Sequence, residues 1–117
     1  MIKCEFYISV DNQELYLDSA YVDSHPEKDE EGNWRPILMN FKPDDNGPIW
    51  EIFSKFFKLG PTSDDTFPNL ASALLSIDDG DAYVLYNIWP KSLRFGLNDN
   101  NNCEVLWRFN GTTLFRK

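Results

Sequence analysis

Apolar and polar residues alternate along several stretches of this chain of 117 residues, which is the pattern of a β-strand with one buried face. The alternation is strict from Ile2 to Val10. It resumes over residues 14–22, where Leu15 and Leu17 are out of phase with Ala20 and Val22. A β-bulge near Asp18 and Ser19 would bring the four onto one face. These two stretches predict an N-terminal hairpin.

Further strands are predicted over residues 37–41, 82–89, 93–97 and 103–109. Residues 82–89 are apolar on both faces, which is typical of a central strand covered by helices on one side, and Pro90 is expected to end it. The last two stretches flank an asparagine-rich loop and predict a hairpin. Its expected core-facing pairs are Leu97 with Cys103, Phe95 with Val105, and Leu93 with Trp107.

Two helices are predicted between these groups of strands. Pro48 suits the first turn of a helix and Gly60 its end, and the polar residues between them form one narrow stripe. A shorter helix is predicted over Pro68–Ile77, where apolar residues recur at helical spacing. The order βββ-αα-βββ predicts a single α+β domain over residues 1–117, with a mainly antiparallel sheet and two helices packed on one face.

The composition is that of a folded protein, because 42% of the residues are hydrophobic despite a net charge of −8. No apolar run approaches the length of a membrane span or a signal peptide, so a cytoplasmic location is expected. In that reducing compartment Cys4 and Cys103 are expected to be unpaired, buried thiols.

Candidate catalytic and metal-binding residues are few. His25 is the single histidine and is expected to be an exposed side chain without a partner, so no zinc site is predicted. The run Asp78-Asp79-Gly80-Asp81 lacks the ligand spacing of a calcium loop and predicts a turn. No phosphate-binding glycine motif or nucleophile motif occurs. These observations predict a protein that is not an enzyme and has no cofactor.

The charges are unevenly distributed along the chain. Residues 11–31 carry eight acids and one lysine, whereas residues 82–117 carry two acids and five basic residues. The acidic regions would repel nucleic acid and favour a basic protein partner, unless they serve only to keep the domain soluble.

Two groups of residues are the candidate partner-binding sites. The first choice is Asp29, Glu30 and Glu31 beside Trp34, since an aromatic anchor ringed by acids resembles a binding hot spot. Trp34 would alternatively cap the core beneath its loop. The second choice is formed by the acids that flank the first predicted helix, which are Asp44, Asp45, Asp64 and Asp65.

Small size, acidity, many aromatic residues and missing catalytic motifs together resemble the bacterial immunity proteins that neutralise contact-dependent or colicin-like toxins. This resemblance implies a tight complex with a basic toxin domain, often a nuclease. A different interpretation is an α+β domain that binds a small apolar ligand or lipid beneath the helix with Trp50, Phe53, Phe56 and Phe57. A third is an oligomerisation subunit that associates with itself through the second face of its sheet.

Overall fold

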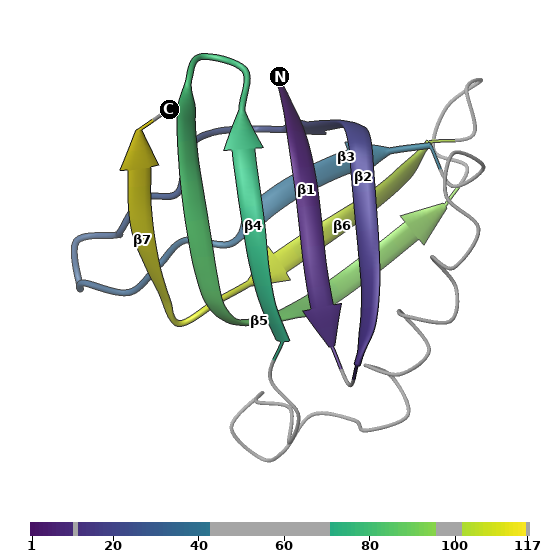
Figure 1. The fold of residues 1–117 in the computed structure, drawn as a ribbon. Coiled ribbons are helices and arrows are strands. Elements are labelled where there is room, and N and C mark those ends of the chain that lie inside the picture. The colour runs from purple at the N-terminus through teal and green to yellow at the C-terminus, as the bar shows by residue number, and fades with distance from the viewer. Residues whose placement is uncertain (11, 43–70, 96–101, 117) are drawn as a thin grey trace.

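The computed structural model describes residues 1–10, 12–42, 71–95 and 102–116. These residues form seven strands, and Figure 1 shows them wrapped into a barrel. The strands are β1 (Ile2–Val10), β2 (Gln13–Val22), β3 (Ile37–Phe41), β4 (Ala71–Ile77), β5 (Asp81–Phe95), β6 (Cys103–Arg108) and β7 (Gly111–Arg116). No helix within this part of the chain has the length and hydropathy to span a bilayer.

All strand pairs are antiparallel, in the order β4-β1-β2-β3-β6-β5-β7. A further pairing of β4 with β5 closes six of the strands into a barrel. Closure removes the free edges that an open sheet would expose. β7 lies outside the closed set and pairs with β5.

β5 takes part in two regions of the barrel because it is long and bends (Figure 1). Its first part pairs with β4 and β7, and its last part pairs with β6. The change of direction lies near Asn87, which has a positive φ of 52°, and near a register shift between Pro90 and Ser92. A bulge of this kind bends a strand and accommodates a proline. The prediction that Pro90 ends the strand is therefore wrong.

The barrel interior is filled by the alternating apolar residues of the strands. Cys4, Phe6 and Ile8 of β1 are fully buried, and Trp107 of β6 packs on Phe6 with ring centroids 5.3 Å apart. Cys4 lies opposite Ala20 and Phe6 opposite Leu17, so β2 has one extra residue at this point. This confirms the predicted bulge, the N-terminal hairpin and the third strand.

The predicted α+β class is wrong, because the described residues form a closed antiparallel barrel and contain no helix. The second predicted helix is strand β4 from Ala71 onward. Ala71, Leu74 and Ile77 have helical spacing, but Ala71, Ala73, Leu75 and Ile77 also alternate, and these four are buried. The alternating set prevails because β1 and β5 pair with β4 on both sides. The first predicted helix, residues 48–60, lies outside the described residues.

The register of the last predicted hairpin is wrong by two residues. Phe95 lies opposite Cys103 and Leu93 opposite Val105. A shift of two residues keeps every side chain on the same face, so alternation cannot distinguish the two registers. The bulge between Pro90 and Ser92 and the closure of the barrel decide between them. Strand β7 was not predicted.

The turn between β4 and β5 depends on Gly80, which has a φ of +105°. A Cβ atom there would meet nothing within 4 Å, so replacement by alanine tests backbone conformation alone. We expect Gly80→Ala to lower the free energy of unfolding by about 1–2 kcal/mol, because side chains with a Cβ disfavour this region. Urea denaturation measures the loss.

Gly111→Ala is the matched control. The φ of Gly111 is not positive, and a new Cβ would lie 3.9 Å from the Tyr86 ring, an ordinary contact. We expect a change within about 0.5 kcal/mol. Equal losses in the two variants would contradict this account of the turn.

Candidate functional site

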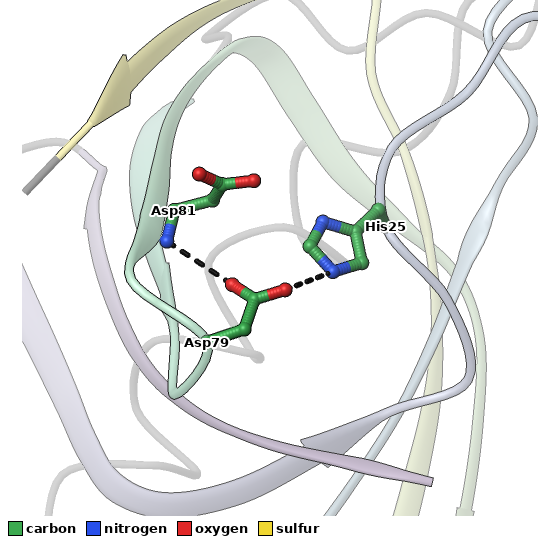
Figure 2. A group of neighbouring side chains, drawn as sticks. All are labelled: His25, Asp79 and Asp81. Atoms are coloured by element: carbon green, nitrogen blue, oxygen red, sulfur yellow. Dashed lines mark hydrogen bonds and ion pairs between the residues drawn. The ribbon is translucent and has the colours of Figure 1, made fainter.

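His25, Asp79 and Asp81 form the one cluster of potential metal ligands among the residues that the structure describes. Figure 2 shows the three side chains converging from the loop after β2 and from the β4–β5 turn. His25 Nε2 lies 2.8 Å from an Asp79 carboxylate oxygen. The other oxygen of that carboxylate accepts the backbone N–H of Asp81 at 3.1 Å. The turn thus holds Asp79 in place for His25.

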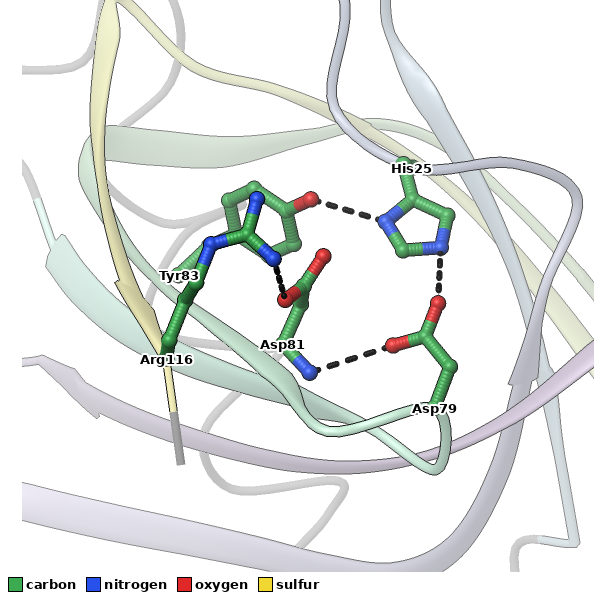
Figure 3. Close-up of polar contacts among 5 residues, drawn as sticks. All are labelled: His25, Asp79, Asp81, Tyr83 and Arg116. Carbon is green, nitrogen blue, oxygen red and sulfur yellow. Dashed lines mark hydrogen bonds and ion pairs between the residues drawn. The ribbon is translucent and has the colours of Figure 1, made fainter.

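Tyr83 and Arg116 extend the cluster (Figure 3). The Tyr83 hydroxyl lies 2.7 Å from His25 Nδ1, and Arg116 lies 3.4 Å from a carboxylate oxygen of Asp81. Burial of the Tyr83 ring, followed by the charges of Asp81 and Asp79, raises the pKa of Tyr83. The phenol therefore stays neutral and able to donate a hydrogen bond.

The cluster joins the loop after β2 to the barrel. One ligand atom from each of His25, Asp79 and Asp81 lies within 4.8 Å of the others, so the three could contact one cation. Both nitrogens of His25 already have partners, however, and Asp81 is paired with Arg116. The prediction of an idle, exposed histidine is wrong. Its partner Tyr83 is 58 positions away, and no local pattern links the two.

The first predicted partner-binding group lies on the loop between β2 and β3. Glu30 and Glu31 are exposed, whereas Asp29 is half-buried and its carboxylate accepts the backbone N–H groups of Glu31 and Asn33, both at 2.9 Å. Asp29 therefore shapes its own loop. The binding role of these acids stays a prediction.

Trp34 has a structural role in the same loop. Its ring packs on Phe109 with centroids 5.5 Å apart, and it rests against the core. Lys28 Nζ lies 5.2 Å from the Trp34 ring centroid, a cation–π arrangement. The aromatic ring thus has a basic neighbour. The second predicted group, Asp44, Asp45, Asp64 and Asp65, lies outside the described residues.

The outer face of the barrel has a row of side chains that crosses five strands. The paired positions place Tyr7 beside Tyr16 and Leu74, and Val84 beside Leu74 and Thr113. We call these five residues the outer row. Tyr16 is 45% and Leu74 41% exposed. Tyr86, which follows Val84 by two residues on β5, is 45% exposed and adds to this surface without being part of the outer row. Figure 1 shows the five strands side by side.

The tyrosines of the outer row are paired with carboxylates. A hydrogen bond to Glu14 raises the pKa of Tyr7, and a hydrogen bond to Glu5 raises the pKa of Tyr16. These contacts keep both phenols neutral and hold the rings on the face of the sheet. An exposed surface rich in tyrosine and other apolar side chains is typical of a protein interface.

The outer row ends at β7, which is an edge strand. Within the described ranges β7 has a β-ladder with β5 and with no other strand. Leu114 is 44% and Phe115 51% exposed. Residues 111–115 contain neither a charged residue nor a proline. Natural proteins usually protect an edge strand with such residues or with a bulge.

The sequence matches no protein-family model and no curated protein. Among solved structures, the fold is similar to that of the Hcp1 protein from E. coli EAEC 042 pathovar, determined as a variant with two tryptophan substitutions. The two are 15% identical with a TM-score of 0.63, and the similarity covers 100% of this chain and 91% of that chain. At this identity the likeness establishes the fold.

The predicted function as an immunity protein is therefore wrong. It depended on composition alone, whereas the barrel fold is similar to that of Hcp1, which is not an immunity protein. The alternative of an α+β domain with a ligand beneath a helix fails with its fold class, because the described strands close around a core of packed side chains. Trp50, Phe53, Phe56 and Phe57 lie outside the described residues.

Proposed function

We propose that this protein is an assembly subunit that associates with a second copy of itself through the edge of β7 that pairs with no described strand. The observation that carries the proposal is the unprotected edge at residues 111–115. An exposed row of unpaired backbone N–H and C=O groups is a template for another strand. Two copies with a net charge of −8 repel each other. A contact segment without charged residues adds no further repulsion, so it is compatible with an identical partner.

A two-fold axis at Thr113 gives a favourable antiparallel register. Thr113 then lies opposite the partner's Thr113, and threonine pairs are favourable across strands. Phe115 lies opposite the partner's Gly111, and Arg116 lies opposite the partner's Asn110. No two like charges meet, and the outer rows of the two copies join into one surface. An isologous contact of this kind closes as a dimer.

The test uses charges placed on the two-fold axis. We expect the wild-type protein to sediment as a dimer of a 13.7 kDa chain. Thr113→Lys and Thr113→Glu should each sediment as monomers, because each places two like charges directly opposite one another. An equimolar mixture of the two variants should recover the dimer. Thr113 is exposed, so both variants should fold.

Ser72→Lys is the matched control, since Ser72 is exposed on the outer face of β4 away from the edge. It should remain dimeric. A monomeric wild-type protein at the highest attainable concentration would overturn the proposal. Dimers that persist in Thr113→Lys, or a mixture that stays monomeric, would exclude this register and this edge.

A further inference from the structure

A cavity of about 570 Å³ lies between the loop before β3 and the region where β5 meets the end of β6. Its charged lining residues include three cations, Lys28, Arg35 and Arg108, and one acid, Asp29. One oxygen of the Asp29 carboxylate accepts two hydrogen bonds from its own loop. We call this space the Trp34 cavity. It has a positive lining in a protein whose net charge is −8.

Arg108 supplies a buried donor that needs an acceptor. Its Nε atom is buried and has no hydrogen-bond partner among the described residues. Buried polar groups in native proteins are nearly always hydrogen-bonded, so an unpaired guanidinium nitrogen calls for an explanation. Arg108 also lines the cavity, and an oxyanion there would accept hydrogen bonds from its guanidinium group, with Nε reached once the side chain turns toward the cavity.

The other two cations are not strongly engaged. Arg35 Nε lies 3.9 Å from Glu27 in an exposed pair, which is a weak interaction. Lys28 rests over the Trp34 ring. Both side chains are exposed, so each can turn toward an anion in the cavity without leaving a buried position.

Aromatic side chains provide the remaining wall. Trp34, Trp89 and Phe109 all line the cavity, and Trp89 and Phe109 are only 6% and 5% exposed. Most of the aromatic surface open to a ligand therefore belongs to the half-buried Trp34. An aromatic face beside cationic donors suits a ligand with a flat apolar part and an anionic group.

We propose that the Trp34 cavity binds a small oxyanion, a carboxylate or a phosphate, that is attached to a flat apolar group. Arg108 would hold the oxyanion, with Lys28 and Arg35 at the rim, and the aromatic wall would contact the flat group. This inference does not depend on association through β7. The acids beside Trp34 in the sequence predicted a basic partner, whereas the cavity beside Trp34 would bind an anion.

Isothermal titration calorimetry with four probes tests the proposal. Benzoate and phenyl phosphate carry both features, inorganic phosphate lacks the ring, and benzyl alcohol lacks the charge. We expect benzoate or phenyl phosphate to bind about tenfold or more tightly than inorganic phosphate and benzyl alcohol, and the stronger of the two identifies the oxyanion. Failure of both ring-bearing anions to bind would overturn the proposal, as would binding of inorganic phosphate as tight as that of the stronger ring-bearing anion.

Arg108→Gln should weaken binding of the stronger probe by about 10- to 100-fold, because charge-assisted hydrogen bonds are lost. Arg94→Gln is the matched control, because it removes the same positive charge as Arg108→Gln. Arg94 is exposed on β5 and does not line the cavity. It should bind like the wild-type protein. Equal losses in the two variants would indicate nonspecific attraction and overturn the site. If Arg108→Gln does not fold, Lys28→Gln takes its place, and unchanged affinity there would count against the site.

Discussion

Trp107→Ala should lower the free energy of unfolding by about 3–5 kcal/mol, the cost of removing a large aromatic side chain from a packed core. Trp107 is 0% exposed and lies on β6 between Ile37 of β3 and Pro90 of β5. Its ring also contacts Phe6 of β1. One side chain thus joins four strands of the closed barrel, and the cavity left by alanine cannot easily collapse.

Urea denaturation followed by circular dichroism measures this loss. Phe115→Ala is the control, because Phe115 is an aromatic residue that is 51% exposed, and its replacement should change stability by no more than about 0.5 kcal/mol in the monomer. If the alanine variant is too unstable to purify, Trp107→Phe replaces it in the measurement, because phenylalanine keeps most of the packing. Losses of similar size in Trp107→Ala and Phe115→Ala would mean that the barrel core is not organised around Trp107.

The second large effect is expected at alkaline pH and arises from the two buried thiols. Cys4 and Cys103 are both free and 0% exposed. Burial, with smaller effects from Asp78 and Glu5, raises the pKa of Cys4 from 9.0 to about 12. Burial, with a smaller effect from Glu104, raises the pKa of Cys103 from 9.0 to about 12. The folded protein therefore keeps both protons over a range in which the unfolded chain loses them.

The sign of the pH dependence follows from this difference. Below pH 9 both states hold the thiol protons, so the thiols add no pH dependence. Between about pH 9 and 12 the unfolded state binds fewer protons, and stability falls as the pH rises. Each thiol contributes a slope of at most about 1.4 kcal/mol per pH unit. The Cys4→Ala/Cys103→Ala double variant should show a clearly shallower decline than the wild-type protein.

Equilibrium unfolding at several pH values between 7 and 11 would measure the two slopes, and the difference between the two proteins removes the contributions of lysine and tyrosine. Native wild-type protein should also resist a thiol reagent at pH 8 and react fully after unfolding. Parallel pH profiles, or rapid reaction of the native thiols, would contradict the expected burial of the two cysteines.

Alternation, interrupted once in β2, was sufficient to predict β1, β2 and β3, because each of these strands has one buried face. The phase change between Leu17 and Ala20 even located the bulge, since a side-chain period of two leaves no other way to bury both. The burial of the two cysteines followed from their positions on alternating strands, whereas their free state was expected from a reducing compartment. These are local consequences of backbone geometry.

Other features were decided by contacts between distant segments. Residues 71–77 fit both a helical and a strand pattern, and only the presence of β1 and β5 on either side makes them a strand. The hairpin register, the bend of β5 and the place of β7 at the edge of the described strands likewise depend on how the barrel closes. His25 meets Asp79 and Tyr83, and Arg108 meets the loop of Trp34, because the fold brings separate segments together. Sequence periodicity reports which face of a strand is buried, whereas its neighbours are selected by the packing of the whole chain.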